Sequence, residues 1–217
     1  TENYGDNQSL KGKKVIVEYT DPNPFKEFHI GHLMSNAVGE SISRLIEASS
    51  AETKRACYQG DVGLHVAKRL DPEYFGRIVV TDIQSSARAY VQGSIDFEND
   101  PNIKDEIILL NKKIYDRNDQ KLNELEYFES IYKRLDTKFD HYFFESNTGV
   151  FGKEVVEKHP EIFEKSDGAI VYKGDESKGL HTRVFINKEG LPTYEAKELG
   201  LAKIKHDTYP YDTSIVI

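Results

Sequence analysis

Short runs of apolar residues alternate along the chain with longer stretches in which apolar residues recur at helical spacing. Residues 15–19 (Val-Ile-Val-Glu-Tyr) form a run rich in β-branched side chains, which predicts a buried strand. Residues 31–49 follow helical spacing, and residues 53–58 predict a second strand. Strand, helix and strand within about 45 residues predict a βαβ unit with parallel strands.

The middle of the chain, residues 67–136, has a different pattern. Residues 103–114 and 121–135 are rich in charge, with apolar residues at helical spacing, and predict amphipathic helices. We therefore expect residues 1–66 to form the first half of a Rossmann-like nucleotide-binding domain. Residues 67–136 would be a helical insertion that faces solvent on one side, and residues 137–217 would continue the α/β domain.

The last third of the chain returns to mixed elements. The pattern predicts strands at 139–144, 169–172 and 183–186, the last two paired, and helices at 150–165 and 194–203. Residues 211–217 read as a buried strand that stops before its turn, and the chain starts at Thr1 without a methionine. Natural termini are usually polar, so we expect a piece of a longer chain.

Composition narrows the class of protein. Charged residues make up 30% and aromatic residues 11%, with a formal net charge of 29 − 37 = −8, which disfavours nonspecific binding to nucleic acid. No apolar run approaches the roughly 20 residues that a membrane span needs. Cys57 is the single cysteine, so no internal disulfide can form. We expect a monomer in the reducing cytoplasm, without a membrane partner.

The first candidate site residues are His29-Ile-Gly-His32, which follow the first predicted strand and lie at the start of the first predicted helix. A helix N-terminus offers unpaired N–H groups to a phosphate, and Gly31 lets a nucleotide approach the backbone. Two imidazoles three residues apart share a helical face and can stabilise charge in a displacement at phosphorus. The alternatives are two ordinary surface histidines or a metal pair, but no further ligand cluster follows at suitable spacing, and we expect no metal site.

Four ordered segments then resemble a known family. His29-Ile-Gly-His32 is the signature of class I aminoacyl-tRNA synthetases, and residues 17–33 around it closely resemble arginyl-tRNA synthetases. Residues 58–63 (Tyr-Gln-Gly-Asp-Val-Gly), 167–170 and 187–198 resemble later segments of the same family. The likeness covers about residues 12–70 and 137–217. It implies the class I α/β fold with a parallel sheet, ATP as substrate with Mg²⁺, and arginine and tRNA(Arg) as partners.

The resemblance also implies roles for single residues. His29, His32 and Lys26 would be catalytic, and His29, Gly31 and His32 would bind ATP. The family's arginine contacts fall on a set of four residues, which are Glu18, Asn23, Tyr194 and Glu198.

The residues themselves leave alternatives open. Burial of a carboxylate within a strand is unfavourable without a partner, and a guanidinium would supply one, although Glu18 could face solvent or pair with a lysine. Tyr194 and Glu198 are four residues apart and share a helical face, as ordinary surface pairs also do. Lys26 could be a plain exposed loop residue.

Several positions depart from the family's pattern. Val62 stands where tryptophan is common, Glu27 where proline is common, Met34 where arginine is frequent, and Glu198 where aspartate is frequent. The sequence holds no KMSKS-like segment and no G-x-D-Q segment, so the resemblance stops before the KMSKS-type loop.

We therefore expect a part of an arginine–tRNA ligase that is inactive alone. One alternative is another nucleotidyl transferase with an HxGH motif. The other is a non-catalytic fragment that binds tRNA or a partner through Lys112, Lys113 and Arg117 of the charged middle region.

Overall fold

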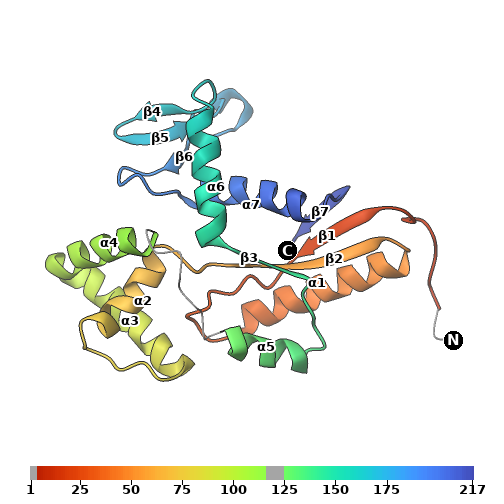
Figure 1. The fold of residues 1–217 in the computed structure, drawn as a ribbon, viewed down its shortest axis with the longest axis horizontal. Coiled ribbons are helices and arrows are strands. Elements are labelled where there is room, and N and C mark those ends of the chain that lie inside the picture. The colour runs from red at the N-terminus through yellow and green to blue at the C-terminus, as the bar shows by residue number, and fades with distance from the viewer. Residues whose placement is uncertain (1–3, 116–124) are drawn as a thin grey trace. The chain divides into compact units, whose positions relative to one another are not determined.

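The computed structural model describes residues 4–115 and 125–217, and Figure 1 traces its elements along the chain. The chain forms two compact units, one made of residues up to 143 together with 211–217, and one of residues 144–210. Within the described residues, no helix is both long and apolar enough to cross a membrane.

A four-stranded sheet is the centre of the first unit. Its strands are β1 (Lys14–Glu18), β2 (Glu52–Gln59), β3 (His141–Phe144) and β7 (Thr213–Val216), in the order β3-β2-β1-β7. β1 pairs in parallel with both β2 and β7. The helix α1 (Ile30–Ala48) connects β1 to β2 (Figure 1), so the predicted βαβ unit is confirmed. Val15, Ile16 and Val17 are buried, as expected for a central parallel strand covered on both faces.

The C-terminal strand is present but is not buried as predicted. β7 lies at the end of the strand order, and Thr213, Ser214 and Val216 are exposed while Ile215 is half-buried. The side chains of a strand point to the two faces of its sheet, so they are buried only where other elements pack on those faces. The predicted strand is therefore confirmed, and its predicted burial is wrong.

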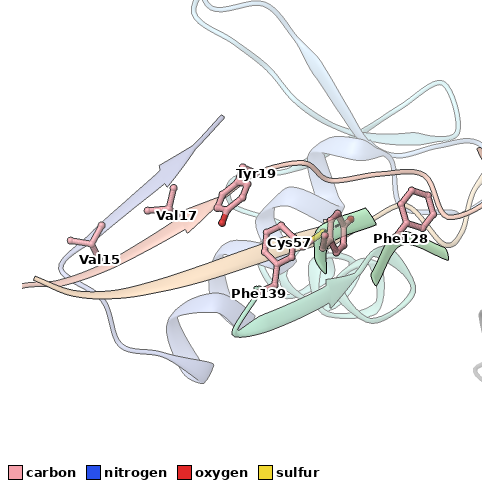
Figure 2. Packing of buried hydrophobic residues seen from close by; sticks show 7 residues of the cluster. Val15, Val17, Tyr19, Cys57, Phe128 and Phe139 are labelled. Carbon is pink, nitrogen blue, oxygen red and sulfur yellow. Dashed lines mark hydrogen bonds between the residues drawn. The ribbon is translucent and has the colours of Figure 1, made fainter. Parts of the chain in front are cut away.

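The main core of the first unit combines the sheet with aromatic side chains from the last helix of the charged middle region. α5 (Leu125–Arg134) contributes Phe128 and Tyr132, which cluster with Cys57, Phe139 and the alternate β1 residues. Figure 2 shows Val15, Val17 and Tyr19 in a row along one face of β1, with Phe139 next to Cys57. Cys57 is buried and unpaired with any cysteine.

The charged middle region is helical, as predicted. It contains α2 (Leu64–Tyr74), α3 (Ile83–Asn99), α4 (Pro101–Tyr115) and α5, while residues 116–124, including part of the predicted helix 121–135 and Arg117, lie outside the described residues. A second core gathers Phe25 with residues of α2 and α4, among them Val66, Ala67 and Ile107. Phe25 belongs to the loop before α1, so these helices pack against the segment that carries the candidate site.

The second unit joins two helices to a small antiparallel sheet. It runs through α6 (Glu145–Lys158), β4 (Glu164–Ser166), β5 (Ala169–Tyr172), the 3-10 helix η1 (Glu176–Lys178), β6 (Arg183–Ile186) and α7 (Tyr194–Thr208). β5 pairs antiparallel with both β4 and β6, which confirms the predicted pair. The helix predicted to reach residue 165 ends at Lys158 because His159 precedes Pro160, and a residue before proline disfavours the helical conformation.

Candidate functional site

The loop between β1 and α1 begins with a strained turn. Thr20 has φ 77° and Asp21 has φ 41°, a region that non-glycine residues seldom occupy. The Thr20 N–H donates to Ser35 Oγ at 2.9 Å, and Asp21 Oδ1 accepts from the Tyr58 N–H at 2.6 Å. The turn is thereby tied to both α1 and β2 at the carboxyl end of the sheet, where parallel α/β folds place their ligands.

The next residues fold the loop toward α2 and α3. Asn23 Oδ1 accepts from the Phe25 N–H at 3.0 Å, an Asx turn that sets the path after the two prolines. No described residue accepts a hydrogen bond from Asn23 Nδ2, so its amide donor is open to a ligand. The Lys26 ammonium lies 4.3 Å from the centre of the Tyr90 ring on α3. Lys26 is half-buried and held by a cation–π contact, so it is not a plain exposed loop residue.

The two histidines of the motif cap α1 reciprocally. His29 is the N-cap residue, and its Nδ1 accepts from the Gly31 N–H at 3.1 Å. His32 Nδ1 in turn accepts from the His29 N–H at 3.3 Å, and the two rings stack with centroids 3.7 Å apart. An N-cap is normally served by Ser, Thr, Asp or Asn. Here imidazole nitrogens take that part, so both histidines contribute to the start of α1.

This cap determines which ring nitrogen carries the proton. A nitrogen that accepts a backbone N–H cannot hold a proton, so the proton of each neutral ring is on Nε2. Neither Nε2 has a hydrogen-bond partner among the described residues. Two N–H donors at a helix N-terminus are thus available to an anion, in addition to the helix dipole.

Electrostatics favour the neutral form of His32. Burial, reinforced by the neighbouring His29 and Lys26, lowers the pKa of His32 from 6.5 to about 4. The Phe28 ring, 5.3 Å from the His32 ring, supplies part of that cover. His32 is therefore a neutral donor at pH 7, in agreement with the tautomer that the cap demands.

Gly31 lies close to the ring that caps the helix. A Cβ placed there would lie 3.0 Å from His29 Cε1. Contacts of that length force a neighbour to move, and the neighbour is the ring that caps the helix. Glycine leaves room for the His29 ring beside the backbone, and the part of Gly31 in nucleotide binding stays a prediction.

Glu18 is the last residue of β1 and is only 2% exposed. The alternative in which it faces solvent is therefore wrong. Its backbone also continues the sheet, because its carbonyl accepts from the Ile217 N–H at 3.0 Å. The carboxylate lies at the carboxyl end of a parallel strand, where α/β folds place their ligands.

The remaining predicted residues belong to the second unit. Tyr194 is the first residue of α7 and is 65% exposed, and Glu198 follows one helical turn later, half-buried. The first unit brings Glu18, Asn23, Lys26, His29 and His32 together on β1, the following loop and α1. Tyr194 and Glu198 are brought together on one face of α7 in their own unit.

The sequence interpretation missed the polar residues that support the loop. Asn36 donates through Nδ2 to Thr20 Oγ1 at 3.1 Å, and its Oδ1 accepts from Thr137 Oγ1 at 2.9 Å. A signal was present, since Asn36, Glu40 and Ser43 are polar at helical spacing within α1. Among the described residues, no group of three or more His, Cys, Asp or Glu side chains could hold a metal ion.

Comparisons with known proteins identify the family of this chain. A sequence model of the family "tRNA synthetases class I (R), catalytic domain" matches residues 1–217. The chain is 29% identical over 228 residues to the arginine–tRNA ligase of Clostridium perfringens, covering 99% of this chain and 40% of that protein. It is 30% identical over 228 residues to the arginine–tRNA ligase of Encephalitozoon cuniculi, again covering 40% of its length.

Solved structures show the same fold. The crystal structure of the Plasmodium falciparum arginyl-tRNA synthetase matches 98% of this chain and 38% of that chain, with a TM-score of 0.66 and 19% identity. The Thermus thermophilus arginyl-tRNA synthetase matches 91% of this chain and 36% of that chain, with a TM-score of 0.63 and 22% identity. The chain spans about 40% of the length of these curated relatives. By its sequence match and its α/β fold, this chain belongs to the family of class I arginyl-tRNA synthetase catalytic domains.

Proposed function

We propose that this chain supplies the arginine- and ATP-binding part of an arginine–tRNA ligase, acting within a longer chain. The observation that carries the proposal is the reciprocal His29–His32 cap, which leaves two Nε2–H donors at the N-terminus of α1. This cap lies one loop away from the buried carboxylate of Glu18. An anionic and a cationic ligand group would thus be recognised at the two ends of one short segment.

In the proposed first step, the carboxylate of arginine attacks the α-phosphorus of ATP in line and pyrophosphate leaves. His29 and His32 donate their Nε2–H groups to phosphoryl oxygens as negative charge builds on them. Lys26 adds a positive charge from the same loop. No covalent bond to the protein is required, so positioning and charge stabilisation account for the catalysis.

Arginine selection follows from fixed acceptors for the guanidinium. In the first unit we assign this part to Glu18, with the Asn23 amide on the amino-acid backbone. For Tyr194 and Glu198 of the second unit, an arginine contact is what the family resemblance implies. Glutamate in place of the family's aspartate at position 198 keeps the charge on a longer arm. Mg²⁺ would arrive with the ATP phosphates. In the second step the arginyl group passes to the terminal ribose of tRNA(Arg), in a monomeric cytoplasmic enzyme.

Isothermal titration of the chain with arginine and with citrulline tests this proposal. Citrulline has nearly the same shape but lacks the charge, so we expect arginine to bind at least about tenfold more tightly, as a charge-assisted hydrogen bond supports. Glu18→Gln should remove the preference for arginine. Glu126→Gln, an exposed position on α5, is the matched control and should keep it.

The outcomes separate the alternatives. Equal affinity for arginine and citrulline, with intact ATP binding, would contradict the arginine proposal and favour another HxGH nucleotidyl transferase. Unchanged ATP binding in the double variant His29→Asn/His32→Asn would contradict the phosphate role and favour a non-catalytic fragment.

A further inference from the structure

Thr20 and Asp21 are two consecutive non-glycine residues with positive φ, which is an unusual conformation. It follows Glu18 after one residue, and it precedes the segment that carries Asn23 and His29. Backbone in this region persists only where the surrounding contacts over-determine it, and such strain gathers at functional sites. The contacts that hold this turn therefore affect the positions of Glu18 before it and of Asn23 and His29 after it.

A buried chain of hydrogen bonds holds the turn. The Thr20 hydroxyl accepts from Asn36 Nδ2 at 3.1 Å, and Asn36 Oδ1 accepts from the Thr137 hydroxyl at 2.9 Å. All three residues are buried, with Asn36 only 3% exposed. Since the amide uses its donor and its acceptor at once, rotating or replacing it breaks both links.

The helix that carries Asn36 also carries the capping histidine. His32 and Asn36 are four residues apart on α1, so they lie one turn apart on one face. Ser35, next to Asn36, accepts from the Thr20 N–H at 2.9 Å. α1 thus anchors the loop at both ends, through Thr20 at its start and through the His29–His32 cap at its end.

We propose that Asn36 is a positioning residue, which fixes the Thr20–Asp21 turn so that Glu18 and the His29–His32 pair are held ready for arginine and ATP. Asn36 is buried, and its amide bonds Thr20 and Thr137, so we assign it no direct contact with either ligand. This inference rests on the proposed function for its ligands. The hydrogen-bonded turn at Thr20 and Asp21 does not depend on which ligands bind.

The test uses Asn36→Leu, which keeps a branched side chain and removes its polar atoms. It also uses a milder pair of variants at Thr137, at the other end of the chain of hydrogen bonds. Thr137→Val keeps the shape and removes the donor to Asn36, whereas Thr137→Ser keeps the hydroxyl and is the conservative rescue. Three quantities are measured on each protein: amide hydrogen exchange of residues 20–29, the NMR titration of His32, and arginine affinity.

We expect Asn36→Leu to raise exchange at residues 20–29 at least tenfold and to weaken arginine binding at least threefold. The His32 midpoint should rise from about 4 toward 6.5, because Phe28 and Lys26 sit on the loosened loop. Thr137→Val should show the same changes more weakly, and Thr137→Ser should match the wild type.

A purely structural Asn36 would give a different result. A lower melting temperature with unchanged loop exchange, unchanged His32 titration and unchanged arginine affinity would overturn the proposal. If Asn36→Leu does not fold, the Thr137 pair decides in the same way. If the wild type binds no arginine, the proposed function fails, while loop exchange and the His32 titration still decide whether Asn36 positions the turn.

Discussion

Each histidine at the start of α1 divides its two ring nitrogens between structure and chemistry. Nδ1 serves the helix N-terminus, and Nε2 is left as a donor. A Ser or Asp cap would satisfy the backbone equally well but would offer no second nitrogen. At this scale the four-residue motif predicted where α1 begins, and its role in binding ATP stays a prediction. It could not predict the tautomer, because the partner of each Nδ1 is known only from the folded loop.

His32 makes stability depend on pH in a defined window. Its pKa is about 4 in the folded chain and 6.5 when unfolded, so between these values the unfolded state binds a proton that the folded state refuses. The part of the unfolding free energy that depends on neutral His32 is therefore fully present above pH 6.5 and is lost as the pH falls toward 4. Urea unfolding at pH 7 and pH 5 should show that the unfolding free energy falls less for His32→Gln than for the wild type.

His159→Gln is the control for that experiment. Its imidazole is exposed and pairs with Glu161, outside the capped loop. The carboxylates that protonate in the same range are common to all variants, so they cancel in the comparison. An equal pH dependence in His32→Gln and the wild type would show that His32 is not held neutral.

At the scale of elements, the most buried residues of α1 are polar or small, whereas hydropathy favours burial of its apolar residues. The helix itself was predicted almost to the residue, and Ile42 and Ile46 do pack on the core. Yet its fully buried residues are Asn36, Gly39, Glu40 and Ser43, while the predicted apolar residue Leu45 is 69% exposed. The sheet offers polar partners here, so buried polar side chains are hydrogen-bonded rather than excluded.

Glu40 shows why that polar face is stable. It accepts from the Tyr19 hydroxyl at 2.6 Å, from Arg55 Nε at 2.9 Å and from Arg44 Nε at 3.0 Å. Burial alone raises the pKa of Glu40, but these hydrogen bonds bring it below its usual range. Removal of one partner from such a network leaves an uncompensated charge, which is the unfavourable case for buried ion pairs.

Gly39 lets this face approach the strand. A Cβ at Gly39 would lie 2.1 Å from Tyr19 Cγ, so Gly39→Ala must displace either the ring or the helix. We expect it to lower the free energy of unfolding by about 1–3 kcal/mol, as overpacking does. Urea unfolding measures the change. Val38→Ala, at the exposed neighbour, should stay within about 0.5 kcal/mol, and equal stability of the two variants would contradict the steric argument.

At the scale of the whole molecule, the chain is two units with separate cores. The first holds the sheet and the aromatic cluster around Tyr132, and the second holds Val156, Ile186 and Ala196 between α6, β6 and α7. The backbones of α6 and α7 approach closely at glycines. A Cβ at Gly152 would lie 1.7 Å from the Ala196 carbonyl oxygen, which is backbone and cannot turn away.

Gly152→Ala should therefore destabilise the second unit, residues 144–210, more than the first. We expect hydrogen exchange to increase throughout residues 144–210, while the protection of β1 and β2 stays as in the wild type, because local unfolding follows cooperative units. Val150→Ala, on the exposed side of α6, is the matched control and should change neither unit. Loss of protection spread evenly over both units would show that they unfold as one.

The sequence by itself determined the family, the parallel βαβ unit, the helical character of the middle region and the candidate histidines. These depend on local periodicity and on residues adjacent along the chain, which a sequence displays directly. The tertiary structure decided the burial of Glu18, the exposure of β7, the polar inner face of α1 and the link from Thr20 through Asn36 to Thr137. Asn36 and Thr137 are about a hundred residues apart along the chain, and only folding sets which polar groups meet.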